Sequence, residues 1–282
     1  MTADHSRHVT AAMDQTSQWT LDDIPWHEID RDRMAGQEEF FYLVAAASFI
    51  EIVSDLYTSN LTGKFSGDDE VTAWLVHHWE NEELQHGRAL KSYVQLAWPD
   101  FDWDRAYRSF FAEYSASCRP EALESTRALE MASRCVVEMG TASYYRALSR
   151  LSPDPVLRRL AGLICEDEVR HYKHFYRYFV RYRQSEAPGR ARVLQALWRR
   201  LKMIRDDDGF LVFKHIYSAR LPGRPVDTAI YRAMLERCRR MAGRHFPHQM
   251  SAKMLLKPLG LAPATQRIAQ STVETLCRYL VA

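Results

Sequence analysis

Hydrophobic residues recur with the period of an α-helix over four long stretches of this chain, and no stretch shows the alternation of a β-strand. Each stretch spans roughly 25–30 residues, which corresponds to about 40–45 Å of helix at 1.5 Å per residue. They cover about Met34–Asn60, Asp68–Trp98, Pro120–Arg150 and Pro155–Arg183. Because long helices with short links pack side by side, the pattern predicts an all-α fold built on a four-helix bundle.

Shorter segments surround these four stretches. A further helix is expected over about Asp104–Ala116, and additional amphipathic helices follow the break EAPG at 186–189. We therefore divide the chain into a polar N-terminal leader (1–33), a helical bundle (34–184) and a helical extension (185–282) that packs on or beside the bundle. The leader has no apolar region typical of a secretory signal. No window approaches 18 consecutive apolar residues, so no membrane-spanning helix is expected.

Each long helix is expected to place one glutamate near the middle of its apolar face, namely Glu51, Glu83, Glu138 and Glu168. A carboxylate in an apolar core is costly unless another group compensates its charge. Glu138 lies about 12 residues before the end of its helix and Glu168 about 13 after the start of the next, so antiparallel packing puts them at one level. Four carboxylates that converge in this way require a cation.

Two of these glutamates are followed three residues later by a histidine, giving the pairs Glu83–His86 and Glu168–His171. Residues at i and i+3 share one face of a helix, so both side chains of a pair can bind one ion. One Glu from each of two helices, with Glu-x-x-His from the other two, is the di-iron or di-manganese carboxylate pattern of ferritin-like bundles. Carboxylate and imidazole suit iron or manganese. The predicted metal ligands are Glu51, Glu83, His86, Glu138, Glu168 and His171.

Three short motifs resemble those of a known family. The segments ENEELQHG (80–87), EMGT (138–141) and DEVRH (167–171) are similar to the EENRHG-like, ExxT and DExxH-like segments of the soluble acyl-carrier-protein desaturases. The resemblance covers about residues 34–184 and is not traceable through 185–282. It implies the same six ligands, two iron ions or a manganese–iron pair, O2 as co-substrate, and an external electron donor such as a ferredoxin.

The resemblance also implies roles for residues beyond the ligands. Thr141 would place its hydroxyl beside the oxygen-binding position, or would bond only to its own helix backbone. Asp167 would orient a ligand histidine, or would be a solvated acid. Trp26 in IPWHEID could relay electrons, although a buried Trp usually only packs.

Charge is distributed unevenly along the chain. Residues 186–282 contain 18 Lys and Arg against 7 Asp and Glu, whereas residues 1–185 contain 20 against 29. A basic segment indicates an acidic partner, and acyl carrier protein is acidic; Arg237, Arg239 and Arg240 would contribute to its docking surface. Alternatively, the basic segment packs against the acidic bundle or forms a homodimer. Nucleic acid is disfavoured because the basic residues are spread through amphipathic helices. The five cysteines are scattered without a CxxC motif, which favours a reducing cytoplasm.

Three functions compete at this point. The first is desaturation or hydroxylation of an acyl chain, for which small residues at 45–48 and 140–143 could leave a channel or could merely allow close helix packing. The second is N-oxygenation of an amine, but that group of enzymes usually has a seventh ligand, a histidine, where this chain has Ile164. The third is a non-enzymatic, ferritin-like iron-binding protein. We favour the first.

Overall fold

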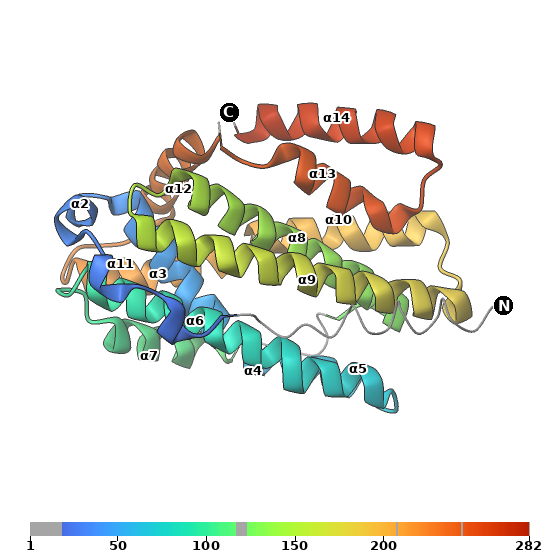
Figure 1. Ribbon diagram of the computed structural model, residues 1–282, viewed down its shortest axis with the longest axis horizontal. Helices are drawn as coiled ribbons and strands as arrows, with labels where there is room; N and C mark the ends of the chain where they lie inside the picture. Colours follow the sequence, from blue (N-terminus) through green and yellow to red (C-terminus); the bar gives the residue numbers. More distant parts are fainter. Residues whose placement is uncertain (1–18, 117–122, 207, 244, 282) are drawn as a thin grey trace.

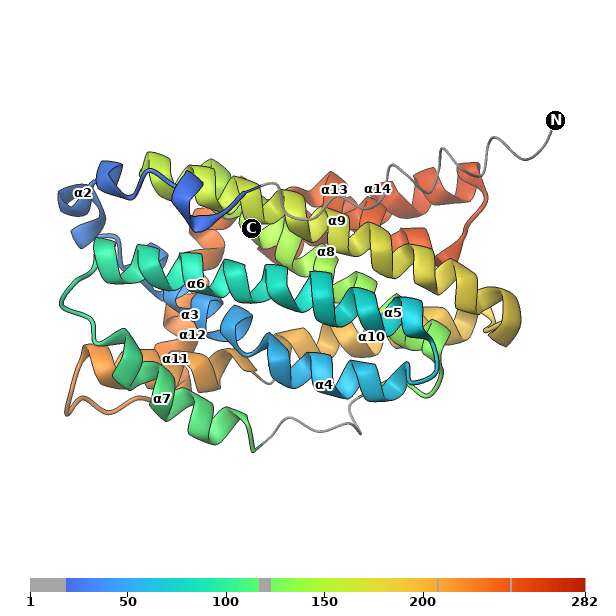
Figure 2. The ribbon, with the colours of Figure 1, turned by 60° about the horizontal axis from the view of Figure 1, so that its bottom comes forward.

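The computed structural model describes residues 19–116, 123–206, 208–243 and 245–281, and throughout these ranges the regular structure is helical, without strands. The expected all-α class is therefore shown. Most of the expected leader, residues 1–18, lies outside the described residues. Residues 19–33 form two short 3₁₀ turns and the start of α2, which lie beside the main helices (Figures 1 and 2).

The longer elements follow one another with short connections. In chain order they are α2 (Arg31–Ala35), α3 (Glu38–Ile52), α4 (Ser54–Lys64), α5 (Asp69–Trp74), a π-helical turn η3 (Leu75–Trp79), α6 (Glu80–Ala97), α7 (Trp103–Tyr114), α8 (Arg127–Leu151), α9 (Pro155–Glu186), α10 (Arg190–Asp206), α11 (Asp208–Arg220), α12 (Thr228–Ala242), α13 (His248–Leu256) and α14 (Pro263–Val281).

Helices α8 and α9 form the central hairpin, and no other pair of described helices makes so extensive a contact. The buried Asp154 starts α9, because its Oδ1 accepts the backbone N–H of Leu157 at 2.8 Å. Pro155 occupies the first helical position, where its missing N–H costs nothing. The other oxygen of Asp154 accepts the backbone N–H of Asp30 at 3.0 Å. One carboxylate thus begins a helix and fastens the N-terminal segment to the hairpin.

Two expected helices are interrupted close to predicted ligands. The stretch 34–60 ends one helix at Ile52 and resumes at Ser54, with a bend of 41° between α3 and α4. The stretch 68–98 contains the π-helical turn η3 directly before α6. The expected start at Pro120 is also not the start of α8, which begins at Arg127 after Thr126 caps it. Pro120 itself lies outside the described residues.

The described core falls into two apolar clusters that lie along the same helices. On α8, Met131 belongs to one cluster and Leu148 to the other; on α9, Phe175 and Leu160 divide in the same way. The positions between them, 138 on α8 and 168–171 on α9, are those of the predicted ligands. The predicted ligands therefore lie between two apolar clusters, which shield them from water.

The C-terminal helices pack against this core. Helices α10 and α13 contact α8, and α11 contacts α7 and α3. Figures 1 and 2 show α13 and α14 on one side of the α8–α9 hairpin and α7 on the other. Among the described residues no single helix is long and apolar enough to cross a membrane, while the bent pair α3–α4 meets that criterion on length and composition alone.

Candidate metal centre

The four glutamates and two histidines predicted from the sequence come together in the interior. Helix α3 carries Glu51, α6 carries Glu83 and His86, α8 carries Glu138, and α9 carries Glu168 and His171. All six side chains are buried. They form two overlapping groups of four, and within each group one ligand atom per residue lies within 4.8 Å of the others. The structure therefore shows a buried Glu/His cluster that could hold a metal ion.

The composition of the two groups is informative. One contains Glu51 and His86, the other contains Glu138 and His171, and both contain Glu83 and Glu168. A carboxylate has two oxygens and can bind a different ion with each. The two groups therefore share two carboxylates, and one Glu and one His complete each group.

Each histidine turns its Nδ1 atom toward the centre. His86 Nδ1 lies 3.3 Å from Glu168 Oε1, and His171 Nδ1 lies 3.1 Å from Glu83 Oε1. The opposite nitrogens face other carboxylates: His86 Nε2 lies 3.0 Å from Asp167 Oδ2, and His171 Nε2 lies 2.8 Å from Glu82 Oε2. Each outer carboxylate can accept the Nε2 proton, which leaves Nδ1 unprotonated for a metal.

The two outer carboxylates are connected to each other. Arg170 donates a short hydrogen bond to Asp167, and its guanidinium also lies 3.6 Å from Glu82 Oε2. Neither Glu82 nor Arg170 was identified from the sequence. The available signal was an acid directly before the glutamate of each Glu-x-x-His pair, in E-E-x-x-H (82–86) and D-E-x-x-H (167–171).

Tryptophan 19, rather than Trp26, reaches the centre. Its indole N–H donates to Asp167 Oδ2 at 2.9 Å, and its ring stacks on the imidazole of His86 with 6.1 Å between centroids. Trp26 instead donates to the carbonyl of Leu21. Both residues precede the first long helix, where no periodicity indicates which side chain points inward.

Two hydroxyl groups touch ligand carboxylates. Thr141 Oγ1 lies 2.5 Å from Glu168 Oε2 and farther, at 3.2 and 3.3 Å, from the carbonyls of Glu138 and Val137. The Thr141 hydroxyl therefore donates its hydrogen bond to the Glu168 carboxylate. The buried phenol of Tyr145 donates a short hydrogen bond to Glu51 Oε1.

Buried carboxylates close together perturb each other's acidity. Burial, and then repulsion by Glu83 and Glu168, holds the pKa of Glu51 well above its ordinary value. Burial likewise raises the pKa of Glu138. Burial acts to raise the pKa of Glu83 too, but hydrogen bonds with His171 and Glu51 lower it to about 2. Among side chains alone, Glu51 and Glu138 therefore favour the protonated form, and a bound cation would favour their carboxylates instead.

Several inward atoms lack hydrogen bonds. His86 Nδ1, His171 Nδ1, Glu138 Oε2 and Glu168 Oε1 are buried and make none within the described part of the chain. All four belong to residues of the two groups. Buried polar atoms rarely stay without a partner, and a cation bound among them would satisfy all four. The residues present therefore fit a metal.

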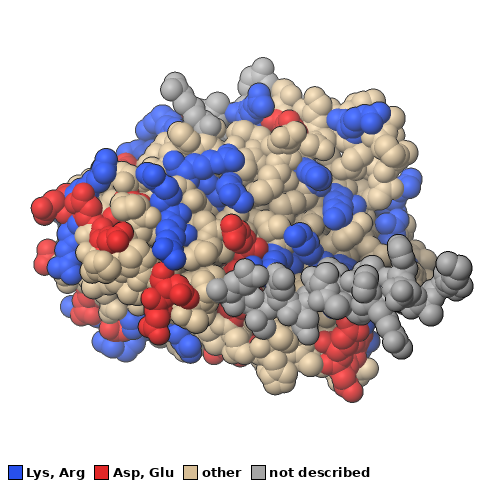
Figure 3. Space-filling model, viewed as in Figure 1, with Lys and Arg blue, Asp and Glu red and all other residues tan. Residues whose placement is uncertain are grey.

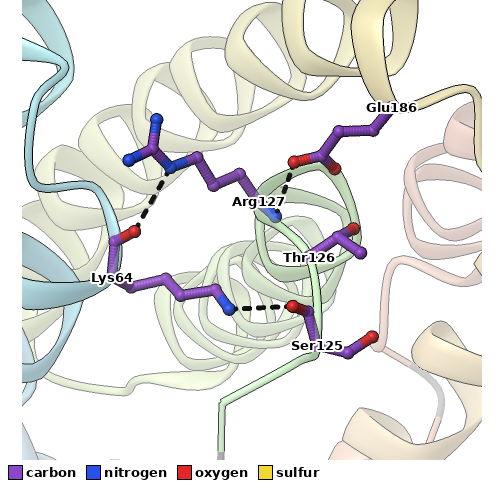
Figure 4. Close-up of a pocket in the computed structure, with 5 residues that line it drawn as sticks. All are labelled: Lys64, Ser125, Thr126, Arg127 and Glu186. Carbon is purple, nitrogen blue, oxygen red and sulfur yellow. Dashed lines mark hydrogen bonds between the residues drawn. The ribbon is translucent and has the colours of Figure 1, made fainter.

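A separate hollow of about 610 Å³ opens where α8 begins, lined by Lys64, Ser125, Thr126, Arg127 and Glu186 (Figure 4). The carboxylate of Glu186 accepts the backbone N–H groups of Arg127 and Ala128, at 3.1 and 2.7 Å. Lys64 Nζ donates to the carbonyl of Ser125. These bonds join α4, α8 and α9, and no residue of the metal-ligand groups lines the hollow.

Comparison with models of known protein families gives no match, and comparison with curated proteins gives none either. The three desaturase-like motifs remain a resemblance, and the centre is interpreted from its own geometry.

Proposed function

We propose that the cluster binds two iron ions within a ferritin-like four-helix bundle, and that the protein is an O2-dependent oxidoreductase. The observation that carries this proposal is the overlap of two four-residue groups through Glu83 and Glu168. Glu51 and His86 would complete one ion's ligand set, and Glu138 and His171 would complete the other. The donors are oxygen and nitrogen, without a thiolate, which favours iron or manganese over softer-ligand metals.

Iron(II) bound here would supply electrons for the activation of O2, chemistry that belongs to the metal rather than to the protein. The chain's own contributions are visible in the contacts described above. Asp167 and Glu82 orient the two histidines, and burial excludes bulk water. The Thr141 hydroxyl donates a hydrogen bond to the carboxylate of Glu168, one of the proposed ligands.

The proposed substrate is an acyl chain, delivered by acyl carrier protein, which would be desaturated or hydroxylated. Support comes from the three motifs shared with the desaturases. Further support comes from Ile164, which is fully buried and has no ligand atom at the position where N-oxygenases usually place a histidine. Small residues such as Ala45 on α3 and Gly140 on α8 would allow room for such a chain, and an added Cβ at Gly140 would meet nothing within 4 Å.

The metal assignment is tested by iron(II) reconstitution followed by metal analysis. We expect about two ions per chain in wild type, and loss of metal and turnover in His86→Ala and His171→Ala with helix content retained. His77→Ala is the matched control, since His77 lies on the exposed side of η3. A single ion per chain, or wild-type turnover in either ligand variant, would contradict the di-iron assignment.

The substrate is tested by incubating the iron-loaded protein with a panel of acyl carrier proteins, a ferredoxin-type reductant and O2. Intact-mass spectrometry should show loss of two hydrogens for desaturation or gain of one oxygen for hydroxylation. Turnover of a free amine, free acid or coenzyme A ester, with every acyl carrier protein unchanged, would refute the carrier-bound substrate while leaving the metal assignment standing.

A further inference from the structure

Tyr145 is the only tyrosine among the described residues whose phenol is hydrogen-bonded to one of the six candidate ligands. It lies on α8, two turns after Glu138, is 1% exposed, and donates its proton to Oε1 of Glu51. None of the roles assigned above uses this side chain.

A phenol that loses an electron also loses its proton, so an oxidisable tyrosine needs a proton acceptor within hydrogen-bond reach. Glu51 Oε1 already accepts a hydrogen bond from the Tyr145 phenol, so a proton acceptor is in place. The adjacent Tyr144 provides the contrast: its ring lies 5.0 Å from that of Tyr145, but its buried hydroxyl has no hydrogen-bond partner within the described ranges. The structure therefore distinguishes two neighbouring tyrosines.

We propose that Tyr145 is redox-active. After O2 has oxidised a bound iron pair, the Tyr145 phenol would give one electron to the iron pair and its proton to Glu51. The proposal rests on the oxidase function proposed above. Oxidation of the phenol would break its O–H bond, form a new O–H bond at Glu51 Oε1, and pass one electron to the bound iron pair. A neutral phenoxyl radical remains on Tyr145. Its burial among apolar residues of the core shields it from solvent reductants.

The experiment mixes anaerobic iron(II)-loaded protein with O2, freezes samples from milliseconds to minutes, and records electron paramagnetic resonance. Wild type should show an organic radical, and growth with ring-deuterated tyrosine should narrow its hyperfine pattern. The signal should be lost in Tyr145→Phe and retained in Tyr144→Phe. Tyr144 is the matched control because it is the neighbouring tyrosine and its hydroxyl has no hydrogen-bond partner within the described ranges. Metal content and circular dichroism confirm that each variant is loaded and folded.

Iron(II) oxidation and O2 consumption are measured in the same wild-type samples. If iron is not oxidised, the proposed function and the radical both fail. If iron is oxidised but wild type gives no tyrosine radical, or if Tyr145→Phe gives the same radical, only the redox role of Tyr145 is refuted. Because the labelled wild type identifies a tyrosine radical by itself, poor folding of Tyr145→Phe would not hide a negative result.

Discussion

At the scale of single residues, each of the two candidate ligand histidines contacts an acid from the neighbouring helix. Successive residues on an α-helix point about 100° apart, so the acid before a ligand glutamate faces the neighbouring helix instead of the centre. Asp167 on α9 therefore meets His86 on α6, and Glu82 on α6 meets His171 on α9. Arg170 offsets the charge of both acids at once.

Replacing Asp167 should weaken metal binding without removing a ligand. Asp167→Asn keeps the shape of the side chain but loses the charge that fixes the His86 tautomer, and such partners typically contribute about 10–100-fold to metal affinity. Competition of iron(II) or manganese(II) binding with a chelator measures the change. Glu166→Gln, one position earlier and exposed, should bind metal like wild type. Equal affinities in the two variants would show that the Asp167–His86 contact has no effect on the metal.

Thr141 allows a different separation, between binding metal and using it. Thr141→Val is nearly isosteric and removes only the hydroxyl that donates to Glu168. We expect unchanged metal content but less product per O2 consumed, because the proton at that position is lost. Simultaneous measurement of O2 uptake and product gives the ratio. A wild-type ratio of product to O2 in the variant would show that the hydroxyl has no part in the use of O2 and makes only local hydrogen bonds.

At the scale of elements, the close packing of α6 against α3 positions two candidate ligands, His86 and Glu51. Gly87 follows His86, and a methyl group built there would lie 2.4 Å from Ile52 Cγ1 and 2.7 Å from the backbone nitrogen of Ile52. Because one of these atoms is backbone, rotation of a side chain cannot relieve the clash. Only glycine allows the two helices to come this close beside Glu51.

Gly87→Ala should therefore displace α3 and reduce both metal loading and stability, since overpacking a close contact costs typically about 1–3 kcal/mol. Gly140→Ala is the matched control. It also lies in a helix, two residues after Glu138, but an added Cβ meets nothing within 4 Å, so the change should be neutral or stabilise by up to about 1 kcal/mol. Chemical denaturation and metal analysis test both variants. Normal loading in Gly87→Ala would contradict the proposed constraint.

Sequence periodicity predicted the long helices and the residues that converge, because Glu-x-x-His spacing and mid-helix position are local properties. It did not predict the interruptions at Val53 and at η3, since neither segment contains a glycine or proline to mark it. Glu82 was missed for a related reason. Whether an acid beside a ligand faces solvent or a histidine depends on the neighbouring helix, which the sequence does not place.

At the scale of the whole molecule, some of the basic residues of the C-terminal helices form ion pairs with acids of the preceding helices. Arg237 pairs with Glu38 and Glu39 at 2.7 and 2.8 Å, and Lys214 pairs with Glu113 at 2.7 Å. On the face drawn in Figure 3, Lys and Arg are spread over the surface, while Asp and Glu gather mainly toward its left and lower edges. The contacts thus provide the internal packing that was considered as an alternative to a docking surface.

This pairing separates the expected effects of two charge reversals. If acyl carrier protein docks on the C-terminal helices, its binding should weaken as salt rises, and the exposed Arg239→Glu should weaken it further. Arg237→Glu should instead lower the stability of the free protein by about 1 kcal/mol or less, as expected for an exposed ion pair. Calorimetric titration at two salt concentrations and thermal unfolding measure these effects. Salt-independent binding, or an unaffected Arg239→Glu variant, would exclude this docking surface.

The sharing of Glu83 and Glu168 has a thermodynamic consequence for how the centre fills. With one divalent ion bound, two of the four buried glutamate charges lack a cationic counterpart, and two ligands for a second ion are already positioned. The ions should therefore bind with positive cooperativity, each raising the affinity for the other by the same factor. Native mass spectrometry of a metal titration should show mainly chains with none or two ions, and activity should rise sigmoidally with metal. A large population of singly loaded chains would indicate that the two positions are independent.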